Sequence, residues 1–116
     1  RVREPFSVNI LGQAGALASL DDTDFLEKTI SLNRSEMTRL VPALNALGLR
    51  SFETQGNFVF SHAKMGGTTL YERLLREGII VRPLMPYGLK EHVRISIGLP
   101  HENDRLLAVL PMVLEA

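Results

Sequence analysis

The 116-residue chain contains no cysteine, and its 13 basic side chains are balanced by 13 acidic ones. The lack of cysteine excludes disulfides, thiolate zinc sites and cysteine nucleophiles. Zero net charge leaves no basic field that would hold nucleic acid or an anionic membrane surface. No apolar run approaches the ~20 residues that a membrane-spanning helix needs, and no signal-peptide pattern opens the chain. We therefore expect a cytoplasmic protein with neither nucleic acid nor a membrane as partner.

Residues that carry out reactions are also scarce. The three histidines are scattered without the spacing of metal ligands, and no Ser/His/Asp order or paired-carboxylate motif is visible. The length fits one small domain or a piece of a larger protein. The chain begins with arginine rather than methionine, which favours a piece of something longer or a trimmed chain. The residues themselves thus predict binding, with no metal site and no catalytic group.

Two short β-branched runs, 79–82 and 92–97, are separated by a segment that contains prolines and a glycine. This pattern predicts two strands of a long-looped hairpin. Arg82 ends the first run and Arg94 lies near the start of the second, so pairing would bring both guanidinium groups to the same end of the hairpin. Such a fork of donors suits a carboxylate or a phosphate. The alternative is that both are ordinary surface arginines, or that a nearby acid such as Glu91 pairs with them.

The rest of the chain predicts helices and one further strand. Small residues dominate a helix over about 10–20, and the run Asp21-Asp22-Thr23-Asp24 caps a second helix that ends before Gly48. Pro42 lies inside this second helix, and we expect a kink or a break near residues 38–41. A capping box at Thr69 opens a third helix, which Gly78 closes.

A last helix is predicted to open with Pro100 at its first position, and Pro111 should bend or shorten it. The segment 57–61 reads as a strand with Phe58 and Phe60 on one face. Asn57 would point the other way, where it could bind a ligand or satisfy its own turn. The expected architecture is α+β: a small, mainly antiparallel sheet with helices on one face, its other face turned toward a partner domain.

Several motifs, in order and spacing, resemble one family. They are Asn57-Phe58, Leu70-Tyr71-Glu72, the segments 78–84 and 93–98, Tyr87-Gly88-Leu89 and Glu102-Asn103, preceded by Val2-Arg3-Glu4-Pro5-Phe6, Val8-Asn9 and Gln13-Ala14. Nearly the whole chain is similar to the C-terminal small domain of histidinol-phosphate aminotransferases. Those enzymes are fold type I aminotransferases that depend on pyridoxal 5'-phosphate, take part in histidine biosynthesis and act as homodimers.

The resemblance implies roles for four residues. Arg94 would clamp the acidic end of the substrate, which is the phosphate of histidinol phosphate or the carboxylate of glutamate. Arg82 would be the second contact to that anion, while Tyr87 and Asn57 would line the approach. The resemblance also implies that residues 1–22 form a linker and the small-residue helix from the large domain, and that residues 23–116 form the small domain.

The chain departs from the family pattern in one decisive way. The Schiff-base lysine of these enzymes has no counterpart, because Lys28, Lys64 and Lys90 all lack its sequence context. We therefore expect no catalytic or cofactor-binding residue here, with the cofactor bound by the large domain, and no transamination by this chain alone. Leu99 replaces a capping threonine, which should weaken the start of the last helix by ~1 kcal/mol. Two alternatives remain: the small domain of an aromatic or other amino-acid aminotransferase, or a non-catalytic α+β module that binds anions or proteins.

Overall fold

The computed structural model describes residues 6–115, and the chain divides between Ser31 and Leu32 into two compact units. The first unit contains the helix α1 (Ile10–Asp21) and the first turns of α2 (Thr23–Ala46). Asn9 caps α1 by accepting a hydrogen bond from the Gly12 amide at 2.8 Å. Asp22 caps α2 in the same way, through the Phe25 amide at 3.1 Å, so the predicted acidic cap is confirmed. The motif at Val2–Pro5 lies outside the described residues.

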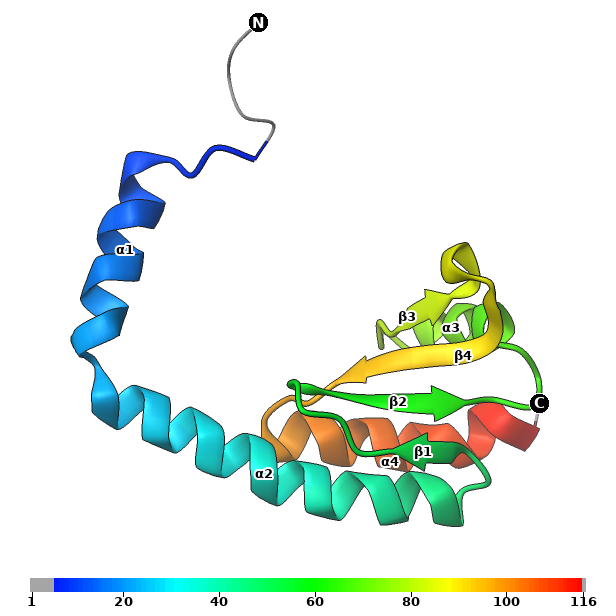
Figure 1. Ribbon diagram of the computed structural model, residues 1–116. Coiled ribbons are helices and arrows are strands. Elements are labelled where there is room, and N and C mark those ends of the chain that lie inside the picture. Colours follow the sequence, from blue (N-terminus) through cyan, green and yellow to red (C-terminus); the bar gives the residue numbers. More distant parts are fainter. Residues whose placement is uncertain (1–5, 116) are drawn as a thin grey trace, which may run out of the picture. The chain divides into compact units, whose positions relative to one another are not determined.

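The second unit is built on a four-stranded antiparallel sheet in the order β1-β2-β4-β3. Its strands are β1 (Arg50–Phe52), β2 (Phe58–His62), β3 (Arg82–Leu84) and β4 (Leu89–Ser96). The short 3-10 helix η1 (Met85–Tyr87) joins β3 to β4, and the helices α3 (Gly67–Arg76) and α4 (Pro100–Glu115) complete the unit (Figure 1).

One face of this sheet forms the core. Val59, Val93 and Ile95 alternate with outward residues along β2 and β4, and each is at most 2% exposed. They belong to one apolar cluster with leucines of the three helices: Leu40, Leu44, Leu70, Leu74, Leu106 and Leu110. Because the inward side chains of the sheet meet all three helices in a single cluster, the helices cover the same face. The predicted α+β fold, with helices on one face of a small antiparallel sheet, is confirmed.

Several local predictions differ from the structure in detail. The first strand of the hairpin begins at Arg82, not Ile79, and it lies at an edge of the sheet, where Pro83 need not donate to a second neighbour. α2 runs through Pro42, which is exposed, so the predicted break does not occur, while the predicted kink stays a prediction. α4 likewise continues through Pro111 to Glu115 and is not shortened, and its bend stays a prediction.

The third helix begins at Gly67, two residues before the predicted cap at Thr69. Its N-cap residue is Gly66, and no side chain makes a capping hydrogen bond there. A Cβ on Gly67 would collide with the carbonyl of His92 in β4. Close packing of the helix on the strand therefore sets where α3 starts, and this contact overrides the local capping pattern.

Candidate anion-binding site

The hairpin formed by β3 and β4 places Arg82 and Arg94 directly opposite each other. They are register partners in the antiparallel pair, and such partners extend from the same face of a sheet. Val93 and Ile95, the neighbours of Arg94 in β4, are buried in the core. Alternation along the strand therefore turns both arginines to the face that the helices leave open.

Arg82 is held by the turn that follows its own strand. Its Nη2 donates a hydrogen bond to the Tyr87 hydroxyl at 3.1 Å, and its Cζ lies 5.9 Å from the centre of the Tyr87 ring. Tyr87 ends η1, after which Gly88 takes a left-handed conformation with φ 78° and returns the chain into β4. Glycine suits this position because side chains with a Cβ rarely adopt that conformation. The turn thus fixes Tyr87 beside Arg82.

Arg94 lies against the ring of Phe58. Its Cζ is 5.3 Å from the centre of the Phe58 ring, and Phe60 is its register partner in β2. The Nε of Arg94 is buried and has no hydrogen-bond partner among residues 6–115. A buried donor without a partner costs free energy unless a ligand satisfies it. Arg94 is therefore a charged group whose Nε–H is available to a ligand.

Within residues 6–115, neither arginine forms an ion pair. The acid considered as a partner, Glu91, instead lies 3.0 Å from the Nε2 of His62. Pairing of Glu91 with the arginines is therefore not what the structure shows. Two guanidinium groups on one face without a carboxylate form a site suited to an anion.

A cleft of about 510 Å³ opens beside the two arginines. Its lining residues come from α3, the segment before β3, and both strands of the hairpin: Tyr71, Ile80, Val81, Arg82, Pro83, Arg94 and Ser96. A second hollow of about 500 Å³ shares Ile80, Val81 and Ser96 with it and extends to α4. A small pocket with apolar walls and a few convergent polar groups is typical of a site for a small molecule.

The four residues singled out from the sequence are not all brought together. Arg82, Arg94 and Tyr87 form one group through the contacts above. Asn57 lies just before β2, exposed, and its carbonyl accepts a hydrogen bond from the Ile97 amide at 2.9 Å. Sequence reasoning missed the place of Tyr71 and Ser96 in the cleft. Ser96 could have been found, because strand alternation puts it on the same face as Arg94.

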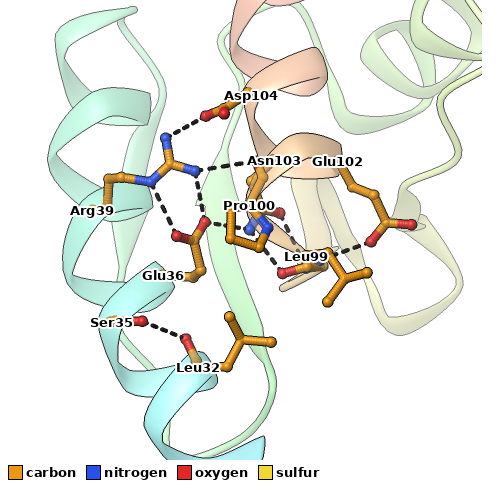
Figure 2. A network of polar contacts seen from close by, with 10 residues as sticks. Leu32, Ser35, Glu36, Arg39, Leu99, Pro100, Glu102, Asn103 and Asp104 are labelled. Carbon is orange, nitrogen blue, oxygen red and sulfur yellow. Dashed lines mark hydrogen bonds and ion pairs between the residues drawn. The ribbon is translucent and has the colours of Figure 1, made fainter.

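A polar network between α2 and α4 supports the far end of β4 (Figure 2). Arg39 donates to both carboxylate oxygens of Glu36, at 3.2 and 2.6 Å, and to Asp104 at 2.6 Å. Asn103 donates to Glu36 Oε2 at 2.6 Å. The hydrogen bonds from Arg39 and Asn103 hold the pKa of Glu36 below its ordinary value, although burial opposes them. The Glu36 and Asp104 carboxylates raise the pKa of Arg39.

The same asparagine fixes the turn that follows β4. Its Oδ1 accepts from the Gly98 amide at 3.0 Å, and its Nδ2 donates to the Gly98 carbonyl at 2.9 Å. The Leu99 amide, where a capping threonine was expected, donates to Glu102 Oε2 at 2.7 Å. The α2–α4 network thereby anchors the strand that carries Arg94. These contacts join residues up to 67 positions apart, which no local pattern indicates.

No residue among 6–115 is suited to attach a cofactor covalently or to bind a metal ion. Lys28, Lys64 and Lys90 are all exposed, whereas a Schiff-base lysine needs a pocket that lowers its pKa. No group of three His, Asp or Glu side chains within residues 6–115 could hold a metal ion. The same residues contain no helix long and apolar enough to cross a membrane.

Comparison with known proteins identifies the family of this chain. Residues 1–110 match the family described as aminotransferase class I and II. The chain belongs to this family. Histidinol-phosphate aminotransferase 2 of Pseudomonas aeruginosa is 47% identical to this aminotransferase chain over 114 residues, 98% of the chain and 31% of that protein. Histidinol-phosphate aminotransferase 1 of Nitrosococcus oceani is 46% identical over 115 residues, again 31% of its length.

Solved structures agree with the family and with the fold. Histidinol-phosphate aminotransferase from Clostridium acetobutylicum has a TM-score of 0.83 and 28% identity over 98% of this chain and 36% of that one. The Sinorhizobium meliloti enzyme, solved in complex with pyridoxal 5'-phosphate, has a TM-score of 0.82 and 28% identity over 98% of this chain and 32% of its own. The aminotransferase chain thus spans about a third of the length of the relatives it matches.

Proposed function

We propose that this chain is the small domain of a pyridoxal-phosphate-dependent aminotransferase that converts histidinol phosphate and 2-oxoglutarate to imidazole acetol phosphate and glutamate, a step of histidine biosynthesis. The observation that carries the proposal is the facing pair of Arg82 and Arg94, which lies beside a cleft and forms no ion pair within residues 6–115. The names of the relatives at 46–47% identity support this choice of substrate.

In this proposal the arginine pair binds the anionic end of each substrate. Arg94 takes the phosphate of histidinol phosphate or a carboxylate of glutamate, since a guanidinium stays charged and fits planar or tetrahedral oxyanions with paired N–H groups. Arg82 is the second contact, and Tyr87 and Asn57 line the approach. By fixing one end of the substrate, these residues hold its amino group in position for the reaction, which lowers the entropic part of the barrier.

The cofactor belongs to another part of the enzyme. Pyridoxal phosphate supplies the electron sink for transamination when bound. Because all three lysines of the chain are exposed, we assign its attachment to residues outside this chain. We further propose that residues 1–22 link the two domains, that residues 23–116 form the small domain, and that the whole enzyme is a cytoplasmic homodimer.

The proposal is tested by an assay of the whole aminotransferase with histidinol phosphate and 2-oxoglutarate, and of this chain alone with added pyridoxal phosphate. We expect turnover by the whole enzyme and none by the chain alone. Turnover by the isolated chain would refute the assignment of the cofactor to another domain. Faster reaction with phenylalanine than with histidinol phosphate would instead identify an aromatic aminotransferase. A coding sequence without an upstream Schiff-base lysine motif would favour a non-catalytic anion-binding module.

A further inference from the structure

Ser96 lines both of the hollows beside the arginine pair. It is the last residue of β4, and it borders the cleft together with Arg82 and Arg94 as well as the hollow that extends to α4. The register of β3 and β4 ends at the pair Arg82–Arg94, so no residue of β3 lies opposite Ser96. Because Ser96 is exposed and alternation turns its side chain to the face of Arg94, its hydroxyl is accessible from the cleft.

The guanidinium of Arg94 lies on the side of that residue where Ser96 follows. Its Cζ is 5.3 Å from the centre of the Phe58 ring, and Phe58 is the register partner of Ser96 in β2. Arg94 and Phe58 are thus diagonal neighbours, and such neighbours on one face of a sheet meet in the space between successive residue pairs. An anion bound to Arg94 would therefore lie beside the Ser96 hydroxyl.

The hydroxyl of Ser96 is available to a ligand. It makes no hydrogen bond to any of residues 6–115. The other two serines of the sheet, Ser51 and Ser61, are buried and share a hydrogen bond of 2.8 Å with each other. Arg82 approaches from the opposite direction, because its Nη2 donates to the Tyr87 hydroxyl in the turn at the other end of β4. Ser96 is therefore a donor on the side of Arg94 that Arg82 does not serve.

We infer that Ser96 is a specificity-determining residue, whose hydroxyl donates a hydrogen bond to the phosphate of the substrate and is not needed for a carboxylate. The inference rests on the proposed function. A carboxylate presents two oxygens in one plane, and a guanidinium binds both with paired N–H groups. A phosphate monoester presents three terminal oxygens in a tetrahedron, so that one of them lies outside the plane of the guanidinium that binds the other two. Ser96 gives this oxygen a donor of its own.

The kinetic test uses Ser96→Val and Ser96→Thr in the whole aminotransferase. Valine and threonine have nearly the same shape and both suit a strand, so the two variants differ in the hydroxyl alone. Ser96→Val should lower kcat/KM for histidinol phosphate about 10-fold, as expected for a hydrogen bond to a charged group. The loss should appear in KM, because the contact acts equally in the bound substrate and the transition state. The kcat/KM for glutamate should change less than twofold, and Ser96→Thr should match the wild type with both donors.

A matched control makes the same chemical change away from both hollows. Thr38→Val replaces a hydroxyl by a methyl group at an exposed position of α2 and should leave kcat/KM unchanged with both donors. Arg94→Gln distinguishes the inference from the proposed function. If Arg94→Gln leaves kcat/KM unchanged with both donors, the proposed function is wrong at this site. If Arg94→Gln lowers kcat/KM while Ser96→Val matches the wild type, or affects both donors equally, the proposed function stands and the role of Ser96 is refuted.

Inhibition by simple anions tests the contact without a bound amino donor. Inorganic phosphate should inhibit the whole enzyme competitively against histidinol phosphate, because it can occupy the arginine pair. Ser96→Val should raise the inhibition constant of phosphate about 10-fold, and Ser96→Thr should retain the wild-type value. Acetate, which offers only a carboxylate, should inhibit the wild type and Ser96→Val with the same constant. A phosphate inhibition constant that is equal in the wild type and Ser96→Val would overturn the inference.

Discussion

Arg39 differs from Arg82 and Arg94 in the partners of its guanidinium group. Arg39, between α2 and α4, is bonded to the carboxylates of Glu36 and Asp104. Arg82 and Arg94, on the open face of the sheet, have aromatic neighbours instead and border a cleft. An arginine whose donors are used by carboxylates fastens two elements together. An arginine placed against a ring keeps its charge, because no carboxylate neutralises it.

The largest effect is expected from replacing Arg94, one of the two arginines on the open face of the sheet. Arg94→Gln should lower kcat/KM for histidinol phosphate about 100-fold, since losing one partner of a desolvated charge pair costs several kcal/mol. Thermal stability should change little, because Arg94 has no carboxylate partner to leave behind within residues 6–115. Steady-state kinetics and a melting curve check both halves of the prediction. A large drop in Tm with kcat/KM unchanged would mean that Arg94 is structural.

For the ion pair of Glu36 with Arg39 we expect the converse, a loss of stability without a change in KM. Glu36→Gln removes a carboxylate whose side chain is 8% exposed and should lower the free energy of unfolding by about 2 kcal/mol, below the full cost of breaking a buried pair because Arg39 is 39% exposed and keeps Asp104. Urea unfolding measures this loss, and KM for histidinol phosphate should stay within twofold of the wild type. A KM change as large as that of Arg94→Gln would mean that Glu36 also affects substrate binding, so that the two regions do not differ in function.

The pH dependence of stability sharpens the same contrast. The pKa of Glu36 is lowered in the folded state, so its stabilising effect is present above the unfolded pKa of about 4.3 and is lost as the pH falls through the folded value. The gap in unfolding free energy between the wild type and Glu36→Gln should therefore be widest near neutral pH and close in acid. Urea unfolding from pH 7 to pH 3 follows it, and a gap independent of pH would contradict the assigned cause.

A smaller effect is expected at the second arginine. Tyr87→Phe deletes the hydroxyl that accepts from Arg82 Nη2 but keeps the ring, and should lower kcat/KM about 5-fold, which corresponds to the ~1 kcal/mol of one exposed hydrogen bond. In an Arg82→Gln background the same change should have no further effect. This double-mutant cycle reports the coupling directly. Additive losses would show that Tyr87 acts independently of Arg82.

The smallest effect should come from Asp104, the exposed member of the polar network between α2 and α4. Asp104→Asn removes a partner of Arg39 whose side chain is 62% exposed, and should change the unfolding free energy by no more than about 0.5 kcal/mol. Arg39 keeps both bonds to Glu36 in this variant. A loss equal to that of Glu36→Gln would place the strength of the network in Asp104 instead.

Regular patterns explain why most of the fold was predictable. Alternation in β4 separated Val93 and Ile95 from Arg94, and the prolines and glycine after Arg82 correctly indicated a hairpin. The predicted long loop is wrong, because β3 ends at Leu84 and β4 already begins at Leu89. The register was not predictable from these signals, because a bulge between Pro83 and Leu84 changes which residues face each other. That Arg82 lies opposite Arg94 is a property of the folded hairpin.

Contacts between distant segments account for the remaining errors. The start of α3 is set by the approach of Gly67 to His92, and the α2–α4 network joins Arg39 to Asp104, 65 residues away. Tyr71 reaches the cleft from a helix whose apolar stripe predicted only core packing. Such features depend on the packing of complete elements, and the capping and periodicity rules act over a few residues only.

The most direct test compares histidinol phosphate with histidinol, which lacks the phosphate, as amino donors for the whole enzyme. If Arg82 and Arg94 bind the phosphate, the wild type should strongly prefer the phosphorylated donor in kcat/KM, and Arg94→Gln, more so with Arg82→Gln, should abolish most of that preference. A preference that survives in the double variant would mean that the anion is bound elsewhere, and the role given to this pair would be wrong.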